Sequence, residues 1–364
     1  MGWEELDLYF NPPLTPNEQL YKFTLINRIG TGNFGEIWLA QDESINRQVA
    51  VKILDASQAA IDEHIQEAHR GNLMDHANLV KIHYADATTR KGTNLFLIAM
   101  DYQPNGSLIQ GLNAGNFMPI KTVLPIISDV LRGLEFLHEQ DLYHNDIKPK
   151  NILLGNNGEG ILTDYGISVA GAGQAYVTPT GAYKLHTAPE LIANNHINGQ
   201  TDIYQVGLTM FRLLNGIGKL RDKLNSLGEA GYYQKVESGN LIQPKDYLPF
   251  IPRNLKSIIT KATHVDPTQR FQTPLEMRRR LEGLNYVGDW TYTPNGNYMG
   301  HCVANEYRFE ESRVGNGTYN FTAFKKNKSS QNERRMGVLC KQRATKQEVE
   351  KAKRDFMQKI VMGS

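Results

Sequence analysis

Cysteine is scarce in this chain of 364 residues, which contains only Cys302 and Cys340. Both lie in the last eighty residues, so the rest of the sequence can form no disulfide. A structural zinc site needs four ligands, and the spacing of these two residues provides no such set. We therefore expect free, buried thiols and a cytoplasmic, reducing location, because proteins of that compartment are poor in disulfides.

Long hydrophobic runs and an excess of one charge are also absent. No run of 18 apolar residues occurs, which predicts no membrane-spanning helix and no membrane partner. The first residues lack a basic start followed by an apolar core, so they predict no secretory signal peptide. With 40% hydrophobic residues, 21% charged residues and a net charge of +2, the composition is typical of a globular protein with one large unit and a smaller one.

The most informative segment runs from His144 to Asn151 and reads HNDIKPKN. An aspartate, a lysine two positions later and an asparagine five positions later suit the transfer of a γ-phosphoryl group to a hydroxyl. Asp146 would accept the proton of the attacking hydroxyl, and Lys148 would stabilise the charge that develops on the phosphate. Asn151 would bind a magnesium ion. This segment therefore predicts a catalytic loop for phosphoryl transfer.

A glycine-rich turn near the N-terminus has the G-x-G-x-x-G spacing, with Gly30, Gly32 and Gly35. Glycines allow backbone N–H groups to approach phosphates closely. The same spacing opens dinucleotide-binding units, where a helix follows the glycines. Here two strand-like segments follow instead, residues 37–40 and 49–53, which favours a lid over ATP.

Three further charged positions extend the candidate site. Lys52, in the second strand-like segment, would contact the α- and β-phosphates and needs a carboxylate partner. Glu63 and Glu67 both lie on the helix-like segment 59–74 and are candidates for that partner. Asp164 sits where a strand runs into a turn and would be the second metal ligand.

These motifs, in this order, resemble the eukaryotic-type serine/threonine protein kinase domain, in a bacterial or phage-related form. The resemblance rests on the glycine turn, VAVK, HNDIKPKN, DYG in place of the usual DFG, and APE at residues 188–190. It covers about residues 20–284. It implies an α+β, two-lobed fold in which a β-rich N-lobe reaches to about residue 102 and a helical C-lobe spans residues 103–284. Residues 1–20 would be an N-terminal extension of a kinase domain spanning residues 21–284.

The resemblance also implies an activity and its residues. A serine/threonine protein kinase transfers the γ-phosphate of ATP to a hydroxyl of a protein substrate, using ATP and Mg²⁺, with Mn²⁺ as an alternative. Glu67 is the preferred partner of Lys52, because the sequence HANLV follows it at the distance seen in kinases. Asp202 would anchor the catalytic loop, and Arg270 would pair with Glu190. The implied adenine site consists of Ile37, Ala50, Met100, Asp101, Gln103 and Leu153.

Two departures from the family pattern affect regulation and substrate recognition. Asn145 replaces the arginine that usually receives a phosphate on the activation loop. Without a guanidinium at that position the phosphate loses its bidentate partner, so we expect activity without phosphorylation there. Tyr183 occupies the place of a threonine in the segment before APE, which weakens any transfer of substrate preference from the family.

The last eighty residues, 285–364, differ in charge from the rest of the chain. They contain 14 Lys and Arg against 8 Asp and Glu, a balance of +6, whereas residues 1–284 contain 26 against 30, a balance of −4. Strands are expected at 290–292, 302–309, 319–325 and 336–341, with a flexible loop from 326 to 335. Thr345 and Glu348 form a capping box that predicts a helix to Val361. The segment is therefore expected to be a small basic α+β domain.

Several functions stay open for this segment and for the chain. The basic residues Lys325, Lys326, Lys328, Arg334 and Arg335 are candidates for binding an acidic or RNA-bearing partner such as a ribosomal surface. A solvated hairpin on a substrate-docking or regulatory module is the simpler interpretation. The alternatives to an active protein kinase are a pseudokinase scaffold that acts through residues 285–364 and a small-molecule kinase. The complete catalytic set argues against the first, and the presence of APE and Arg270 argues against the second.

Overall fold

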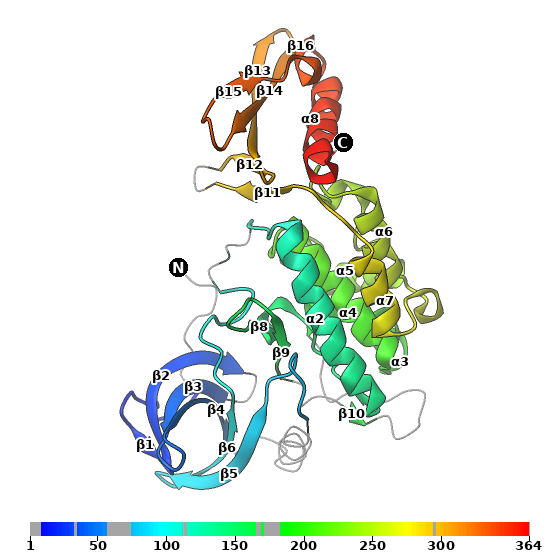
Figure 1. The fold of residues 1–364 in the computed structure, drawn as a ribbon. Coiled ribbons are helices and arrows are strands. Elements are labelled where there is room, and N and C mark those ends of the chain that lie inside the picture. Colours follow the sequence, from blue (N-terminus) through cyan, green and yellow to red (C-terminus); the bar gives the residue numbers. More distant parts are fainter. Residues whose placement is uncertain are drawn as a thin grey trace.

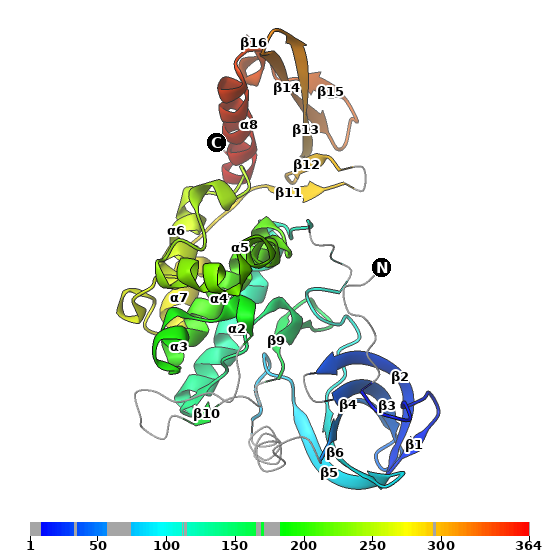
Figure 2. The ribbon, with the colours of Figure 1, turned by 180° about the vertical axis from the view of Figure 1, so that it is seen from behind.

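The computed structural model describes residues 9–32, 35–56, 74–110, 112, 115–164, 169–170, 183–293 and 296–363. A curved sheet and a helical body form two lobes, and a second sheet with one long helix lies at the far end of the helical body (Figure 1). The view from behind shows the same order, with the two sheets at opposite ends of the molecule (Figure 2). The predicted α+β, two-lobed fold with an added C-terminal α+β unit is confirmed.

The N-lobe is an antiparallel sheet whose strand order is β1-β2-β3-β4-β6-β5. Its strands are β1 (Gln19–Leu20), β2 (Phe23–Gly32), β3 (Gly35–Asp42), β4 (Arg47–Asp55), β5 (Ile82–Arg90) and β6 (Thr93–Met100). Alternate residues of β4 face opposite sides, as the pleat requires. Val49, Val51 and Ile53 enter a small core on one side, and Ala50 and Leu54 join the larger core on the other.

The residues before β1 pack against this sheet. Phe10 and Leu14 are buried in the small core of the N-lobe. Arg90, in β5, donates to the backbone oxygens of Pro12 and Pro13 and forms an ion pair with Glu18. The described part of the predicted N-terminal extension is therefore held on the N-lobe by both apolar and charged contacts.

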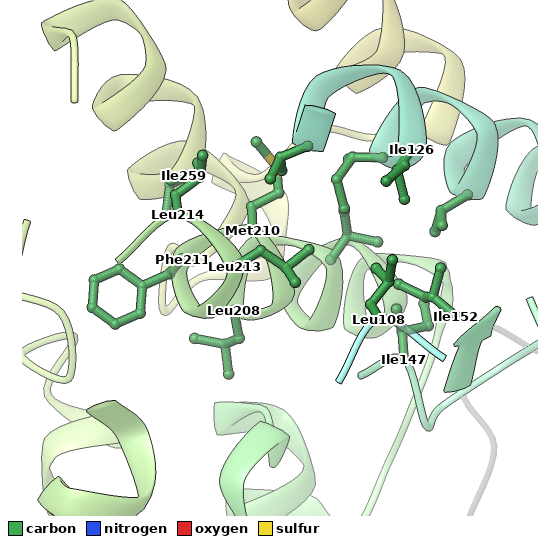
Figure 3. Close-up of a cluster of buried hydrophobic side chains, with 14 of the residues drawn as sticks. Leu108, Ile126, Ile147, Ile152, Leu208, Met210, Phe211, Leu213, Leu214 and Ile259 are labelled. Carbon is green, nitrogen blue, oxygen red and sulfur yellow. The ribbon is translucent and has the colours of Figure 1, made fainter. Parts of the chain in front are cut away.

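The C-lobe is built from helices α2 to α7. They are α2 (Ile120–Glu139), α3 (Pro189–Asn194), α4 (Gly199–Asn215), α5 (Lys219–Glu237), α6 (Arg253–Ala262) and α7 (Pro274–Glu282). Apolar residues recur along α2 at helical spacing and face α4, whose residues from Thr201 to Asn215 are all buried. Figure 3 shows the resulting core around α4, which also contains Ile147 of the predicted catalytic loop. No helix in the described ranges is both long and apolar enough to cross a membrane.

Residues 285–363 form the C-terminal module. Its strands are β11 (Asp289–Tyr292), β12 (Tyr298–His301), β13 (Asn305–Gly315), β14 (Thr318–Asn327), β15 (Glu333–Arg335) and β16 (Lys341–Ala344), and its helix is α8 (Lys346–Met362). The sheet order is β11-β12-β13-β14-β15, and β16 also pairs with β14. The fully buried Trp290 lies edge-on against Phe309 of the sheet and Phe356 of α8, so these rings join the two layers.

Some details predicted for this module are confirmed and others are wrong. The capping box of Thr345 and Glu348 begins α8 as predicted. The strand expected at residues 336–341 is wrong, because a short 3-10 turn at Gly337–Leu339 separates β15 from β16. The loop expected at 326–335 is shorter, since β14 extends to Asn327 and β15, which is hydrogen-bonded to β14, begins at Glu333. The cysteines are free, but both are half-buried, not fully buried.

The C-terminal module and the C-lobe share one hydrophobic core. The ring of Phe117, just before α2, stacks on Tyr298 of β12 and also contacts Phe250 of the C-lobe. Pro119, at the N-terminal end of α2, provides no side-chain cap. Asp289 of β11 caps this helix instead, because its two carboxylate oxygens accept the backbone N–H groups of Ile120 and Lys121, each at 2.8 Å. The module therefore completes a helix of the C-lobe.

Replacing Asp289 with alanine should lower the free energy of unfolding by about 1–2 kcal/mol, the usual effect of losing a helix cap. Asp289→Asn should have a smaller effect, because its amide oxygen can still accept one of the two bonds. Urea unfolding monitored by circular dichroism measures both changes. Asp222→Ala is the control, since Asp222 lies exposed in the first turn of α5. Equal losses from the two alanine variants would contradict the capping role.

Candidate active site

The predicted catalytic loop is fixed by a buried carboxylate of α4. It begins after β7 (Leu142–Tyr143) and ends in a 3-10 turn, Pro149–Asn151. The fully buried Asp202 accepts the backbone N–H groups of His144 at 2.9 Å and Asn145 at 2.7 Å. Its carboxylate also contacts His138 Nε2 at 2.8 Å. Asp202 anchors the loop, as the resemblance implied.

The backbone of the loop explains one of its departures from the family pattern. Asn145 has a φ of 57°, in the left-handed region, and Asp164 has a φ of 59°. Asparagine and aspartate tolerate this region better than most residues do, because their short polar side chains bond locally. An asparagine at position 145 therefore fits the local conformation, although it removes the positive charge.

Three polar side chains of the loop converge on Asp146. Lys148 Nζ lies 2.9 and 2.7 Å from the two carboxylate oxygens of Asp146. Asn151 Nδ2 donates to the backbone oxygen of Asp146 and to Oδ2, both at 2.9 Å. The buried His144 accepts the N–H of Asp146 at Nδ1 and approaches the carbonyl of Thr163 at Nε2, 3.1 Å away. The carboxylate is thus held by groups on each side of it.

Lys52 and Asp164 face each other across the two lobes, with Lys52 Nζ 3.7 Å from Asp164 Oδ1. The predicted partner Glu67 and its alternative Glu63 lie outside the described residues. In the glycine-rich turn, Gly30 is opposite Ile37, and Gly32 is opposite Gly35, in the β2–β3 pair.

The last of these glycines is required by packing. A Cβ at Gly35 would lie 1.9 Å from the backbone oxygen of Ile53, so no other residue fits there without a shift of the strands.

Lys150 of the catalytic loop donates to the backbone oxygen of Thr31 at 3.1 Å. The catalytic loop and the glycine-rich turn are therefore in direct contact.

The predicted adenine-site residues lie on neighbouring strands. Ala50 of β4 is opposite Met100 of β6, and both belong to the large core, against which Ile37 and Leu153 pack. Asp101 follows β6, and its carboxylate contacts Arg47 and His83 on the adjacent strands. Gln103, two residues later, accepts the N–H of Gly106 with its backbone oxygen and so begins a turn.

The donor atoms near Asp164 fit a hard divalent cation. Because Asn151 Nδ2 is used by Asp146, the carbonyl oxygen of Asn151 is the atom of its amide left to bind a metal. The carboxylate of Asp164 is 30% exposed. An amide oxygen and a carboxylate leave room for water and phosphate ligands, which is the coordination that Mg²⁺ prefers.

A buried ion pair ties the segment before α3 to the rest of the C-lobe. Arg270 bonds both carboxylate oxygens of Glu190 at 2.8 Å, and its guanidinium is fully buried. It also donates to the backbone oxygens of Gln200, His264 and Val265. The predicted pairing is confirmed, and the extra bonds satisfy donors that burial would otherwise leave without partners.

Two residues near the loop were not predicted. His186 is buried and approaches the backbone oxygen of Ile147 at 2.7 Å with Nδ1, and Arg212 of α4 donates to its Nε2 at 3.0 Å. Burial and the neighbouring guanidinium lower the pKa of His186 well below its usual value, so the ring is neutral. The sequence did contain a signal for Arg212: it is the only basic residue in the otherwise largely apolar segment that forms the later part of α4.

Comparison with known proteins agrees with this geometry. The model of the protein kinase domain family matches residues 23–279. The serine/threonine-protein kinase PrkC of Bacillus subtilis is 28% identical over 268 residues, which cover 72% of this chain and 40% of PrkC. PknJ of Mycobacterium bovis is 29% identical, covering 71% of this chain and 45% of PknJ. PknB of Mycobacterium leprae is 27% identical, covering 73% and 43% respectively.

The chain spans less than half the length of these curated relatives. The matched region runs from β2 into α7 and therefore includes every residue of the catalytic loop, the glycine-rich turn and the Glu190–Arg270 pair. The match covers more than half of the chain, and the pairing of Lys52 with Asp164 and of Asp146 with Asn151 agrees with it, so the chain belongs to the protein kinase domain family.

Proposed function

We propose that this protein is an ATP-dependent serine/threonine protein kinase that uses Mg²⁺. The observation that carries the proposal is the arrangement of Asp146, whose carboxylate is bonded by Lys148 and Asn151, together with the pairing of Lys52 with Asp164. The relatives PrkC, PknJ and PknB are all serine/threonine-protein kinases by name, which supports the same activity.

The proposed reaction assigns one role to each side chain. Asp146 orients the substrate hydroxyl and receives its proton as the hydroxyl oxygen bonds to the γ-phosphorus of ATP. The bond from that phosphorus to the β–γ bridging oxygen breaks, and ADP leaves. Lys148 neutralises charge on the transferred phosphoryl group, and Lys52, with Glu67 as its partner, holds the α- and β-phosphates.

Asn151 and Asp164 would hold the metal through oxygen atoms. When bound, Mg²⁺ neutralises phosphate charge and orients the γ-phosphate for in-line transfer. Gly30, Gly32 and Gly35 would let backbone N–H groups approach the phosphates. Ile37, Ala50, Met100 and Leu153 would form the apolar walls of the adenine site, with the backbone from Asp101 to Gln103 at its edge.

The test of the activity is direct. The purified chain is incubated with labelled ATP, Mg²⁺ and a generic protein substrate, and the phosphorylated amino acids are identified after hydrolysis. Label on serine or threonine, absent with Asp146→Asn, is expected. A labelled small molecule with no labelled protein would instead favour a small-molecule kinase, and no transfer at all would favour a scaffold.

We also propose that the C-terminal module docks an acidic partner through the basic hairpin, defined as Lys325, Lys326, Lys328, Arg334 and Arg335. Lys325 is directly opposite Arg334 in the β14–β15 pair. Like charges at opposite positions destabilise a sheet, so a bound anion would relieve their repulsion. On the other face, Glu333 is opposite Lys326 and pairs with Arg308, which reduces the positive potential available to RNA.

Reversing the charges of Lys325 and Arg334 to glutamate should weaken phosphorylation of docked substrates and leave ATP turnover unchanged. Substrates are detected by mass spectrometry in a lysate whose own kinases have been inactivated by heat. We expect a loss of about tenfold at low salt that shrinks as salt screens the attraction. Lys346→Glu with Lys351→Glu on α8 is the matched control, because both side chains are exposed and the charge change is equal. Equal losses from both pairs would refute docking at the hairpin.

A further inference from the structure

Arg212 carries a buried positive charge that the proposed reaction does not use. The residue is 5% exposed. Its Nε donates to the backbone oxygen of Ile217 at 3.1 Å and its Nη1 to His186 Nε2 at 3.0 Å. The side chain of Tyr183 also lies beside the guanidinium. All three partners are neutral, which distinguishes Arg212 from Arg270 with its carboxylate partner.

Among the described residues, no carboxylate is a partner of the Arg212 guanidinium. Its pKa is lowered by burial, and no carboxylate in the described residues offsets that effect. The segment from 165 to 182, which connects Asp164 to Tyr183, contains no Asp or Glu. Burying an ion without a counter-ion is unfavourable, and strongly perturbed buried groups cluster at sites of binding or catalysis. A negatively charged group of a bound ligand would supply the missing counter-charge.

Two series of side-chain contacts connect Arg212 to the catalytic loop, where the substrate hydroxyl would bind. In one, His186 links the guanidinium to the backbone oxygen of Ile147, the residue after Asp146. In the other, the ring of Tyr183 lies between Arg212 and Lys148, whose Nζ is 4.5 Å from the ring centroid. Tyr183 is only half-buried, so Arg212 lies one side chain below the surface beside the catalytic loop.

We propose that Arg212 is a specificity-determining residue that selects substrates with an acidic side chain close to the phosphorylated serine or threonine. An extended polypeptide rises about 3.3–3.6 Å per residue, so a hydroxyl at Asp146 places the next few residues within reach of Tyr183 and Arg212. The carboxylate would supply the counter-charge. Lys148 and Lys150 in the same loop add positive charge and disfavour a basic residue there. This inference rests on the proposed protein kinase activity.

The experiment measures kcat/KM on a family of peptides. A neutral reference peptide with one serine is compared with peptides carrying a single Glu or Lys at each position within about three residues of it. At one position or more, wild type should prefer Glu over Lys by about tenfold, a typical value for one charge-assisted contact. Arg212→Gln should reduce that ratio to about twofold or less, whatever its effect on the neutral peptide.

The remaining variants separate charge from folding. Arg212→Met, an apolar replacement of similar length, tests the same loss if the glutamine variant melts early. Arg212→Lys should keep part of the preference, because it keeps the charge. Arg221→Gln is the matched control. Arg221 is exposed and its charge repels that of Arg212, but it has no contact with the catalytic loop among the described residues. It should retain the full preference.

Two outcomes would overturn the inference without touching the proposed activity. One is phosphorylation of the neutral peptide with no preference for Glu at any position. The other is that complete dephosphorylation of wild type, verified by intact mass, lowers transfer to all peptides as much as Arg212→Gln does. In that case Arg212 binds a phosphate on the activation segment instead of a substrate. If no peptide or protein is phosphorylated by wild type, the proposed activity itself fails.

Discussion

Asp164→Asn should reduce phosphate transfer by on the order of a hundredfold or more, because removing an electrostatic ligand of a transition state has effects of this size. The only partner described for the carboxylate is Lys52, at 3.7 Å, and the side chain is 30% exposed. Asparagine has nearly the same shape, so the free energy of unfolding should change by less than about 0.5 kcal/mol. Labelled phosphate incorporation and thermal melting measure the two quantities.

The control for this variant is Asp75→Asn, which makes the same change at a side chain that is 83% exposed and paired with Lys81. It should leave both quantities unchanged. Raising the concentration of Mn²⁺, which binds nitrogen and oxygen ligands more tightly than Mg²⁺, should restore part of the lost activity in the Asp164 variant. Retention of more than a few per cent of wild-type transfer with Mg²⁺ would contradict the role of Asp164 as a metal ligand.

Ending the chain at Leu284 should abolish the soluble, folded protein. Without the C-terminal module, Phe117 and Phe250 lose the ring of Tyr298, and α2 loses the cap from Asp289. Gln358 of α8 no longer donates to the backbone oxygen of Pro249. Exposing large apolar side chains costs about 1.5–3 kcal/mol each, and the cap adds about 1 kcal/mol. These losses approach the 5–15 kcal/mol that stabilises a typical protein.

The truncated chain is tested by soluble yield and by cooperative melting. Co-expression of residues 285–364 as a separate fragment is the informative control, because it should restore solubility if the shared core is the cause. A truncated chain that melts cooperatively near the wild-type temperature and phosphorylates the neutral peptide would show that the kinase domain is independent. The boundary proposed near residue 284 would then separate two domains that fold on their own.

The parts of the fold that could be predicted are those encoded by local signals. The glycine spacing, the strand ending at Lys52, and the capping box of Thr345 and Glu348 each act over a few residues. The two-lobed arrangement was implied instead by the resemblance to protein kinases. The resemblance to kinases supplied the longer-range pairs, such as Arg270 with Glu190, which no local pattern indicates.

What could not be predicted depends on contacts between distant segments. β15 and β16 both pair with β14, so the chain must turn between them, and nothing local to Gly337 distinguishes this turn from a strand. The cap from Asp289 reaches across 169 residues. The roles of His186 and Arg212 arise only when α4 lies beside the catalytic loop, because their partners are far apart in the sequence.

The distance in sequence between Asp289 and the helix it caps also bears on synthesis. At about 5–20 residues per second, a ribosome needs roughly 10–30 s after making Ile120 before it adds Asp289. During that interval the first turn of α2 has no cap from β11, and the other end of this helix leads straight into the catalytic loop. Long-range contacts of this kind form late. A nascent chain therefore has to reach Asp289 before the first turn of α2 is capped, and we expect kinase activity only after that point.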